Sequence, residues 1–282
     1  MTGSGNDFVF FDGRIVSASV VTQPDVVKAI CNRHNGIGAD GVVVLEPGSQ
    51  GRATSGSPGS ASAPQATILY FNSDGTPADL CGNATLCSTA LSVALGLGPS
   101  DGMGLLTPSG RIEARIVNGL PEIRLQPVQR VDIDSEVELA AGEIRVGFAV
   151  VGIPHLVVFC DDADAVDLAQ RGPLLRRHSA GGPTGANVNW VSARPDGSWR
   201  YRTFERGVEG ETLACGTGAV ATAVLLNAWG LAGRHADIVS SSGRTLSVSL
   251  SDAGSEPGLI PALRGEGRVV FSGTISDLGN QT

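Results

Sequence analysis

Two cysteines, each followed by glycine, are the residues of this chain best placed to do chemistry. Cys81 and Cys215 lie 134 positions apart (215 minus 81), and each opens a segment of small and polar residues followed by a mostly apolar run. The glycines that close these runs, Gly96 and Gly230, keep the same offset. The repeat indicates two related halves, each presenting one thiol. Sulfur atoms on either side of a carbon could remove a proton from one face and supply one to the other, which would invert that carbon.

A second repeat supports the duplication. The tripeptide Ser-Gly-Arg at 109–111 returns at 242–244. Each copy is followed by apolar residues at alternate positions, a pattern typical of a half-buried strand. These residues are Ile112, Ala114 and Ile116 in the first copy and Leu246, Val248 and Leu250 in the second.

The apolar runs behind the two cysteines predict helices that are buried on all sides. Residues 85–95 and 218–229 are nearly all small or apolar, and a helix that is apolar all round is buried all round. Each helix should run through the middle of its half, so that only its N-terminus can reach a cleft. A helix N-terminus offers free N–H groups and a partial positive charge. We therefore expect the pKa of each cysteine thiol to be lowered and a carboxylate to bind at Gly82-Asn83 and Gly216-Thr217.

This arrangement suits removal of a proton from the α-carbon of an amino acid, which is difficult because the resulting carbanion is unstable. Two helix N-termini directed at the α-carboxylate would stabilise the developing charge, with one sulfur acting as thiolate base and the other as thiol acid. The alternative interpretation is that both cysteines are buried and pack as small apolar residues. The remaining cysteines lack such a placement, and we assign structural roles to Cys31, Cys87 and Cys160.

Composition and charge argue against several other functions. At 282 residues the chain is long enough for about two domains, and 41% apolar residues is ordinary for a globular protein. No segment approaches the roughly 20 unbroken apolar residues of a membrane span, and the N-terminus does not resemble a signal peptide. Five cysteines without close spacing fit free thiols in the cytoplasm. The net charge of −8 argues against nucleic acid as a partner.

The sequence also predicts an enzyme without cofactor or metal. The single lysine, Lys28, lies in a predicted surface helix, which disfavours pyridoxal phosphate held as a Schiff base. Four scattered histidines, with neither a Cys-x-x-Cys nor a His-Glu-x-x-His motif, provide no set of metal ligands.

The predicted elements are dominated by strands and lack the regular alternation of a doubly wound sheet. A low-complexity segment at 47–65 is expected to be a mobile surface loop without a functional role. Besides the two Cys-Gly helices, the pattern predicts strands at 6–12, 42–45, 66–72, 144–151, 155–160, 186–192 and 199–205, hairpins within 105–125 that turn at 109–110 and 118–119, helices at 24–33 and 163–178, and a last strand or pair at 263–275 that could return to the first half.

At these residues the chain resembles the diaminopimelate epimerase family, cofactor-independent two-cysteine enzymes of lysine and cell-wall biosynthesis. The resemblance covers nearly the whole chain, and its most specific part is the run Glu-Arg-Gly-Val-Glu-Gly-Glu-Thr-Leu-Ala-Cys-Gly-Thr-Gly at 205–218. The other matching segments are Ser4-Gly-Asn-Asp-Phe8, Arg33-His-Asn-Gly-Ile-Gly-Ala-Asp40, Phe71-Asn-Ser-Asp-Gly75, Cys81-Gly-Asn83, Pro154-His155 and Ala186-Asn-Val-Asn189.

The resemblance implies an α+β fold of two pseudo-symmetric halves, each a curled, mainly antiparallel sheet wrapped around a central apolar helix. We expect the first half at 1–117 plus 264–282 and the second at 118–263, with the active-site cleft between them. The resemblance further implies an isomerase that epimerises LL-2,6-diaminopimelate to the meso form, with a small amino acid as its substrate. It also implies a homodimer in the cytoplasm.

Matching to the family assigns a role to each candidate residue. Cys81 and Cys215 match the two proton carriers. His155 and Glu205 match the pair that supports thiol ionisation and holds the reacting amine. Residues that bind the two ends of the substrate match Asn6, Asn72, Asn187 and Arg206, and those that cradle the α-carboxylate match Gly82, Asn83, Gly216 and Thr217. The structural alternatives are a buried histidine at a strand start, an exposed Glu-Arg ion pair and asparagines that cap turns.

Three departures from the family pattern leave the substrate open. Ile153 stands where the family usually has asparagine before Pro-His, Ala84 where glycine usually follows Cys-Gly-Asn, and Leu86 where arginine is usual. One alternative is therefore a racemase for another amino acid that uses the same two thiols. A non-catalytic amino-acid-binding protein is the least favoured alternative.

Overall fold

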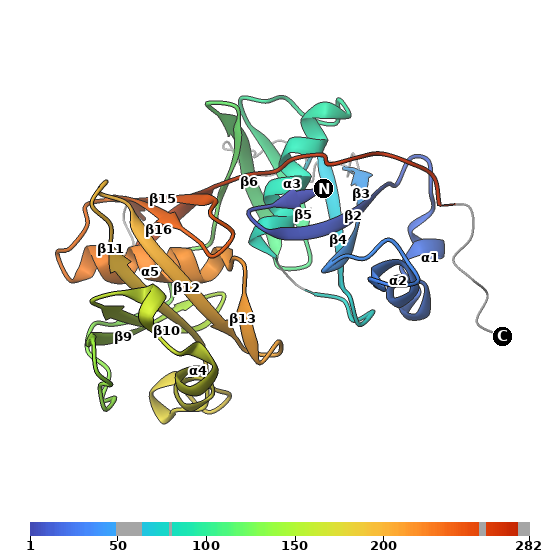
Figure 1. Ribbon diagram of the computed structural model, residues 1–282. Helices are drawn as coiled ribbons and strands as arrows, with labels where there is room; N and C mark the ends of the chain where they lie inside the picture. Colours follow the sequence, from blue (N-terminus) through green and yellow to red (C-terminus); the bar gives the residue numbers. More distant parts are fainter. Residues whose placement is uncertain (49–63, 79–80, 254–257, 276–282) are drawn as a thin grey trace. The chain divides into compact units, whose positions relative to one another are not determined.

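The chain divides into two compact units, each described here by itself (Figure 1). The computed structural model describes residues 1–48, 64–78, 81–253 and 258–275. Unit 1 comprises Met1–Ile123 and Glu266–Thr282, and unit 2 comprises Arg124–Gly265. The boundaries expected from the sequence, after residue 117 and before residue 264, lie a few residues from these. The active-site cleft between the halves stays a prediction.

Unit 1 contains one mixed sheet with the strand order β1-β2-β3-β4-β5-β6-β7. Its longest helix, α3, packs against β1, β2, β3, β4 and β6. The elements are β1 (Thr2–Gly3), β2 (Asn6–Asp12), α1 (Ala18–Val21), α2 (Pro24–Cys31), β3 (Gly41–Pro47), β4 (Ala66–Asn72), α3 (Gly82–Ala94), β5 (Met103–Thr107), β6 (Gly110–Val117) and β7 (Leu120–Arg124).

Unit 2 repeats this plan with the strand order β8-β9-β10-β11-β12-β14-β15-β16, and β13 pairs with β12. Its longest helix, α5, packs against β9, β10, β11, β14, β15 and β16. The elements are β8 (Arg130–Asp132), β9 (Glu143–Val151), β10 (Ile153–Cys160), η1 (Ala163–Ala165), α4 (Leu168–Arg176), η2 (Ser179–Gly181), β11 (Asn187–Ala193), β12 (Trp199–Glu205), β13 (Gly210–Thr212), α5 (Gly216–Ala228), β14 (His235–Val239), β15 (Thr245–Asp252) and β16 (Leu259–Arg264).

The pairing of the strands shows that the two units share one topology. The series β2-β3-β4-β5-β6 is paired parallel, antiparallel, parallel and antiparallel. The series β10-β11-β12-β14-β15 follows the same sequence of directions. In each series the Cys-Gly helix follows the third strand. The expected α+β fold is confirmed, and both repeats found in the sequence fall at matching places in it.

Both central helices are buried because nearly every side of each one is apolar or small. In α5, buried residues run without interruption from Gly218 to Leu226. In α3, Gly82 to Thr89 are buried and only the last turns reach the surface. The prediction of two helices surrounded by strands is confirmed, and it leaves the helix starts as the places where chemistry can occur.

Most elements appear where the sequence predicts them. Strands β2 and β4 have the predicted bounds. Asn118 and Gly119, predicted to turn the second hairpin, both have positive φ angles (51° and 77°), as a two-residue hairpin turn of this kind requires. Of the predicted loop at 47–65, residues 49–63 lie outside the described part of the chain. At its base, the N–H of Gly48 donates to the carbonyl of Gln65 at 2.8 Å.

Two predicted elements are wrong in extent. The helix expected at 163–178 is split into η1 and α4, because the side chains of Asp162 and Asp167 each cap a separate helix start. Of the strand expected at 263–275, only the first two residues lie in a strand, the end of β16 (Leu259–Arg264). Beyond it, the described residues of the segment join unit 1 through paired backbone hydrogen bonds between Thr2 and Arg268, of 2.8 and 2.9 Å, and Ile275 packs against the core cluster around Val27. Its apolar residues misled the prediction because they are exposed: Val269, Val270 and Phe271.

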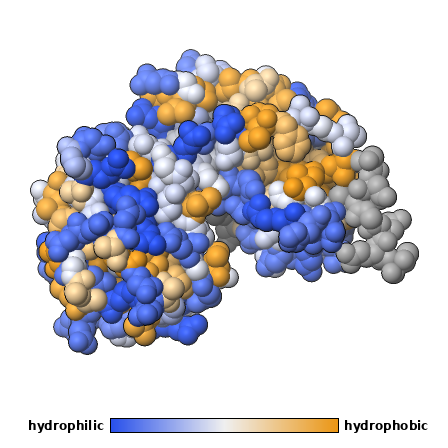
Figure 2. Space-filling model, viewed as in Figure 1, coloured by the Kyte–Doolittle hydropathy of each residue, from blue (hydrophilic) through white to orange (hydrophobic). Residues whose placement is uncertain are grey.

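Helix α2 is amphipathic and covers one part of unit 1. Val27, Ile30 and Cys31 are buried, whereas Lys28 lies at the surface beside Asp25, at 3.8 Å. Figure 2 shows hydrophilic residues over the visible face around this helix. In the described part of the chain, no helix is both long and apolar enough to cross a membrane.

Candidate active site

Cys81 and Cys215 occupy the same position at the starts of the two central helices. Each is the residue just before its helix, with φ and ψ of −129° and 115° for Cys81 and −126° and 112° for Cys215. Each carbonyl accepts the first hydrogen bond of its helix at 2.9 Å. A thiol at this position lies next to the N–H groups of the first helical turn, which favour a negative charge. Gly82-Asn83 and Gly216-Thr217 form the first turns, as predicted.

The other three cysteines lie in the interior. Burial raises the pKa of the Cys31 thiol to about 11 and the pKa values of the Cys87 and Cys160 thiols to about 12. These thiols therefore stay protonated near neutral pH, which agrees with the structural roles predicted for them.

In unit 1 the predicted residues Asn6 and Asn83 contact each other beside the start of α3. The Nδ2 of Asn83 donates to the Oδ1 of Asn6 at 2.6 Å. The Nδ2 of Asn6 donates in turn to the Oδ2 of Asp40 at 2.9 Å. Because both ends of the Asn6 amide are engaged, its orientation is fixed.

A charged group behind Asn6 was missed by sequence reasoning. Arg33 donates to Asp40 at 2.7 Å and to both carboxylate oxygens of Asp7 at 2.8 and 2.9 Å. Burial raises the pKa of Asp7, but Arg33 outweighs it and holds this pKa below its usual value, so Asp7 stays ionised. Asp7, Arg33 and Asp40 all lie in segments that match the family, but the match assigned them no individual role.

Asn72 lies at the end of β4 in a tight turn. Its Nδ2 donates to the Oγ1 of Thr76 at 3.1 Å, and its N–H donates to the Thr76 carbonyl at 2.9 Å. Gly75, with φ of 82°, completes the turn. Asn72 thus makes contacts that stabilise a turn, which was the structural alternative to substrate binding. Its role in binding a substrate stays a prediction.

Tyr70 is a neighbour of Cys81 that no sequence motif singled out. Its ring packs edge-on against Phe8, with the centroids 5.9 Å apart. Burial raises the pKa of Tyr70 well above its usual range, and negative charge at Cys81 raises it further. The tyrosine therefore stays a neutral hydroxyl beside this thiol. Gly41 leaves the space for it, since a Cβ there would lie 2.6 Å from the Cε2 of Tyr70.

In unit 2, polar groups surround the sulfur of Cys215. The Nδ2 of Asn187 lies 3.8 Å from this sulfur and can donate to it. The hydroxyl of Thr217 lies 3.5 Å away. The Oδ1 of Asn187 accepts from the N–H of Arg206 at 2.9 Å, which orients the amide toward the sulfur. The predicted residues Asn187, Arg206, Cys215 and Thr217 are therefore brought together.

Glu205 is the last residue of β12 and Arg206 follows it, beside this group. The hydroxyl of Thr212 donates to the Oε1 of Glu205 in a short hydrogen bond. The guanidinium of Arg206 donates to the Oγ1 of Thr184 at 2.8 Å. Each charged group is held by a threonine, and both side chains are only partly buried.

His155 is fully buried at the start of β10, on the strand next to Asn187. Burial, together with the positive charge of Arg206, lowers the pKa of His155 to about 3, so the ring is neutral at physiological pH. Its Nδ1 lies 3.3 Å from the Nδ2 of Asn189, while its Nε2 has no hydrogen-bond partner among the described residues. Sequence reasoning noted Asn189 only as part of a motif and did not select it.

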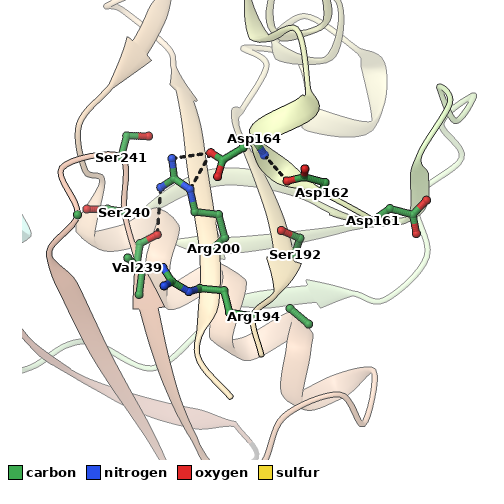
Figure 3. A pocket seen from close by; sticks show the side chains of 11 residues that line it. Asp161, Asp162, Asp164, Ser192, Arg194, Arg200, Val239, Ser240 and Ser241 are labelled. Atoms are coloured by element: carbon green, nitrogen blue, oxygen red, sulfur yellow. Dashed lines mark hydrogen bonds and ion pairs between the residues drawn. The ribbon is translucent and has the colours of Figure 1, made fainter. Parts of the chain in front are cut away.

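Unit 2 also has a pocket of about 550 Å³ in which opposite charges face each other (Figure 3). Arg200 pairs with Asp164 at 2.7 Å and also donates to the carbonyl of Val239 at 3.4 Å. None of the described lining residues is a predicted site residue. They are Asp161, Asp162, Asp164, Ser192, Ala193, Arg194, Arg200, Val239, Ser240, Ser241 and Gly243. We assign no function to this pocket.

Comparison with known proteins decides the family. The family described as diaminopimelate epimerase matches residues 1–126 and 147–268. A diaminopimelate epimerase of Gemmatimonas aurantiaca is 60% identical over 285 residues, which covers 99% of this chain and 98% of the relative. The chain belongs to the diaminopimelate epimerase family. A second relative with that name, from Hydrogenobaculum, is 33% identical and covers 89% of this chain and 90% of its own length.

Among solved structures, a phenazine biosynthesis protein of the PhzF family from Bacillus anthracis has the same fold. It superposes with a TM-score of 0.68, at 13% sequence identity, over 94% of this chain and 91% of its own. At this identity the similarity concerns the fold alone. It agrees with the expected α+β architecture of the diaminopimelate epimerase family.

Proposed function

We propose that the protein converts LL-diaminopimelate to meso-diaminopimelate. Of Cys81 and Cys215, one removes the proton of one α-carbon and the other supplies a proton to the opposite face of that carbon. The observation that carries this proposal is the identical placement of these cysteines before two buried helices. The proposal is supported by membership in a family whose 60% identical member bears the name of this activity. It requires no cofactor and no metal.

The reaction balances with the two thiols alone. One cysteine, as thiolate, removes the α-proton, and the electron pair of the broken C–H bond passes into the adjacent carboxylate. The other cysteine, as thiol, delivers its proton to the opposite face of the carbon and becomes a thiolate. The roles of the two sulfurs are then exchanged, and proton exchange with solvent restores the starting state.

Groups at the helix starts would stabilise the charge that develops in this reaction. The N–H groups of Gly82-Asn83 and Gly216-Thr217 suit the α-carboxylate, because free helical N–H groups bind anions. The amide of Asn187 can donate to the Cys215 sulfur and would favour its thiolate form. The remaining predicted groups would hold the substrate's amine and its distal end: Asn6, Asn72, His155, Glu205 and Arg206.

Two of the departures from the family pattern affect packing inside unit 1. Ala84 is 1% exposed and Leu86 is fully buried, so both side chains lie in the interior of the unit. Ile153, the first residue of β10, is partly exposed and is the departure with the better access to a substrate. A racemase for another amino acid is therefore an alternative that rests on Ile153.

The proposal extends to the assembly and the compartment. We infer a homodimer from the family resemblance. We infer a cytoplasmic location because five cysteines, an odd number without close spacing, do not suit a disulfide framework.

Incubation with LL-diaminopimelate in heavy water tests the proposal. We expect meso product with deuterium at the inverted α-carbon. The matched control is the double variant Cys81→Ala, Cys215→Ala, which should form none. A panel of other L-amino acids in the same assay tests the alternative. If diaminopimelate does not exchange and another amino acid does, the substrate is wrong, and if nothing exchanges, the enzymatic proposal fails.

A further inference from the structure

The side chain of Asn189 is buried beside His155 and uses its full hydrogen-bonding capacity. It is 0% exposed. Its Nδ2 faces two atoms, the carbonyl oxygen of Leu156 at 3.0 Å and the Nδ1 of His155 at 3.3 Å. Its Oδ1 faces the hydroxyls of Tyr201 at 2.9 Å and Thr203 at 3.0 Å. A carboxamide has two N–H donors and two acceptor sites, so every one of them is matched.

The carbonyl of Leu156 determines which way round the amide lies. A carbonyl oxygen can only accept, so the atom 3.0 Å from it must be the nitrogen of Asn189. The reversed amide would place two oxygens against each other in a buried site, which is unfavourable. The two hydroxyls accommodate the observed orientation because each can donate to the amide oxygen.

This orientation determines the proton of His155. Because the amide nitrogen is a donor, the Nδ1 facing it must be an acceptor and carries no hydrogen. A neutral imidazole has one N–H, which must then be on Nε2. We propose that Asn189 is a positioning residue that holds His155 as the neutral Nε2–H tautomer, so that His155 serves the reaction as a hydrogen-bond donor and not as a base. This inference rests on the proposed function for its catalytic meaning, though not for the tautomer itself.

Burial and charge support the same protonation state. His155 is 0% exposed, and the pKa of its ring is lowered to about 3 by burial and by Arg206. A proton added at Nδ1 would also meet the N–H of Asn189. Among the described residues the Nε2 atom has no hydrogen-bond partner, so its N–H can donate to a substrate or to a thiolate. A donor of this kind would stabilise a developing negative charge without accepting the proton.

The network connects His155 to the start of α5. The hydroxyl of Tyr201 lies 3.3 Å from the carbonyl oxygen of Cys215 as well as beside Asn189. Gly218, in the first turn of α5, leaves the space for both. A Cβ at that position would lie 2.3 Å from the Tyr201 hydroxyl and 2.4 Å from the Oδ1 of Asn189. The residue that orients His155 is thus packed against the helix that presents Cys215.

Nitrogen-15 NMR of labelled wild-type protein at neutral pH reads the tautomer directly, with the His155 signals assigned by their loss in His155→Gln. We expect a pyrrole-type Nε2 that carries hydrogen and a pyridine-type Nδ1 that does not. A proton on Nδ1, or an imidazolium ring, overturns the proposal even if the enzyme is fully active. Because the spectrum does not depend on turnover, failure of the proposed function would be recognised separately.

The variant Asn189→Asp tests the catalytic meaning. A carboxylate in place of the amide nitrogen would accept from Nδ1, so we expect the proton to move to that nitrogen. The value of kcat should then fall on the order of a hundredfold, with KM changed much less. The matched control is Asn118→Asp in the exposed turn of unit 1, which should keep the wild-type tautomer and kcat. A switched tautomer with unchanged kcat overturns the role, and should Asn189→Asp not fold, the wild-type spectrum still decides the tautomer.

Discussion

The two cysteine sites have the same backbone and different surroundings. The φ and ψ angles of Cys81 and Cys215 agree within a few degrees. Cys81 is partly exposed and lies beside Tyr70. Cys215 is 7% exposed and lies beside both Tyr201 and the amide of Asn187. The duplicated fold therefore keeps the helix start that favours a thiolate, while the groups that tune each thiol differ between the units.

Matched strand positions show the same divergence. Phe8 pairs with the first residue of β3, and His155 pairs with the first residue of β11. The position that holds an aromatic packing residue in unit 1 thus holds a buried, neutral imidazole in unit 2. The third residue after each cysteine also differs, being Ala84 in α3 and Gly218 in α5. These paired positions make the comparison testable.

The largest expected effect comes from removing either thiol. Cys81→Ala and Cys215→Ala should each lower kcat about 10²- to 10⁴-fold, because each variant loses one of the two proton carriers. Steady-state assays in both directions, from LL and from meso substrate, measure the loss. Cys160→Ala is the control, because this buried thiol belongs to the hydrophobic core of unit 2 and donates to the Val191 carbonyl at 3.5 Å, so kcat should stay near that of the wild type. A single cysteine variant with wild-type kcat would show that the two sites do not share the reaction.

Substitution of the third helical residue should destabilise the two units to different extents. Gly218→Ala forces a methyl group against Tyr201 and Asn189 and should cost about 1–3 kcal/mol of unfolding free energy. Ala84→Gly, at the matched position, should cost only about 0.5–1 kcal/mol because it lowers helix propensity. Urea denaturation of both variants gives the comparison. Adding Tyr201→Phe to Gly218→Ala should recover part of the loss, and equal costs for the two single variants would contradict the account.

His155 should make unit 2 sensitive to acid. Its pKa is about 3 in the folded protein against 6.5 for an ordinary histidine, so below pH 6.5 the unfolded chain binds a proton that the folded chain does not. The free energy of unfolding should therefore fall as the pH decreases from 6.5 toward 3, by about 1.4 kcal/mol per pH unit from this group. Urea denaturation of wild type and His155→Gln across this range isolates the effect, because the carboxylates are common to both. Parallel curves would contradict the assigned burial.

Sequence patterns were sufficient for the parts of the protein that follow local rules. The two buried helices follow from their apolar runs, and the Asn118-Gly119 turn follows from residues that tolerate positive φ. Motif matching selected Asn6 and Asn83, which contact each other, as well as Asn187 beside Cys215.

Other parts could not be predicted because they depend on contacts between distant segments. The amide of Asn189 joins β10 to hydroxyls on β12, 12 and 14 residues further along the chain, and no local pattern signals such a network. Helix capping by Asp167 divided a segment that looked like one charged helix. The last strand was misjudged because apolar residues that predict burial are here exposed at the surface.

The central claim is that the two cysteines act as separate acid and base, and the early distribution of isotope in heavy water tests it most directly. Starting from LL-diaminopimelate, the thiol that delivers a proton has already exchanged with heavy water and delivers deuterium. The proton that the thiolate removes stays on the sulfur that removed it and does not return to the substrate. The account predicts that the first meso product carries deuterium at its inverted α-carbon while the recovered LL substrate remains unlabelled. Deuterium that enters the recovered substrate and the product equally from the start would point to a single base and contradict the account.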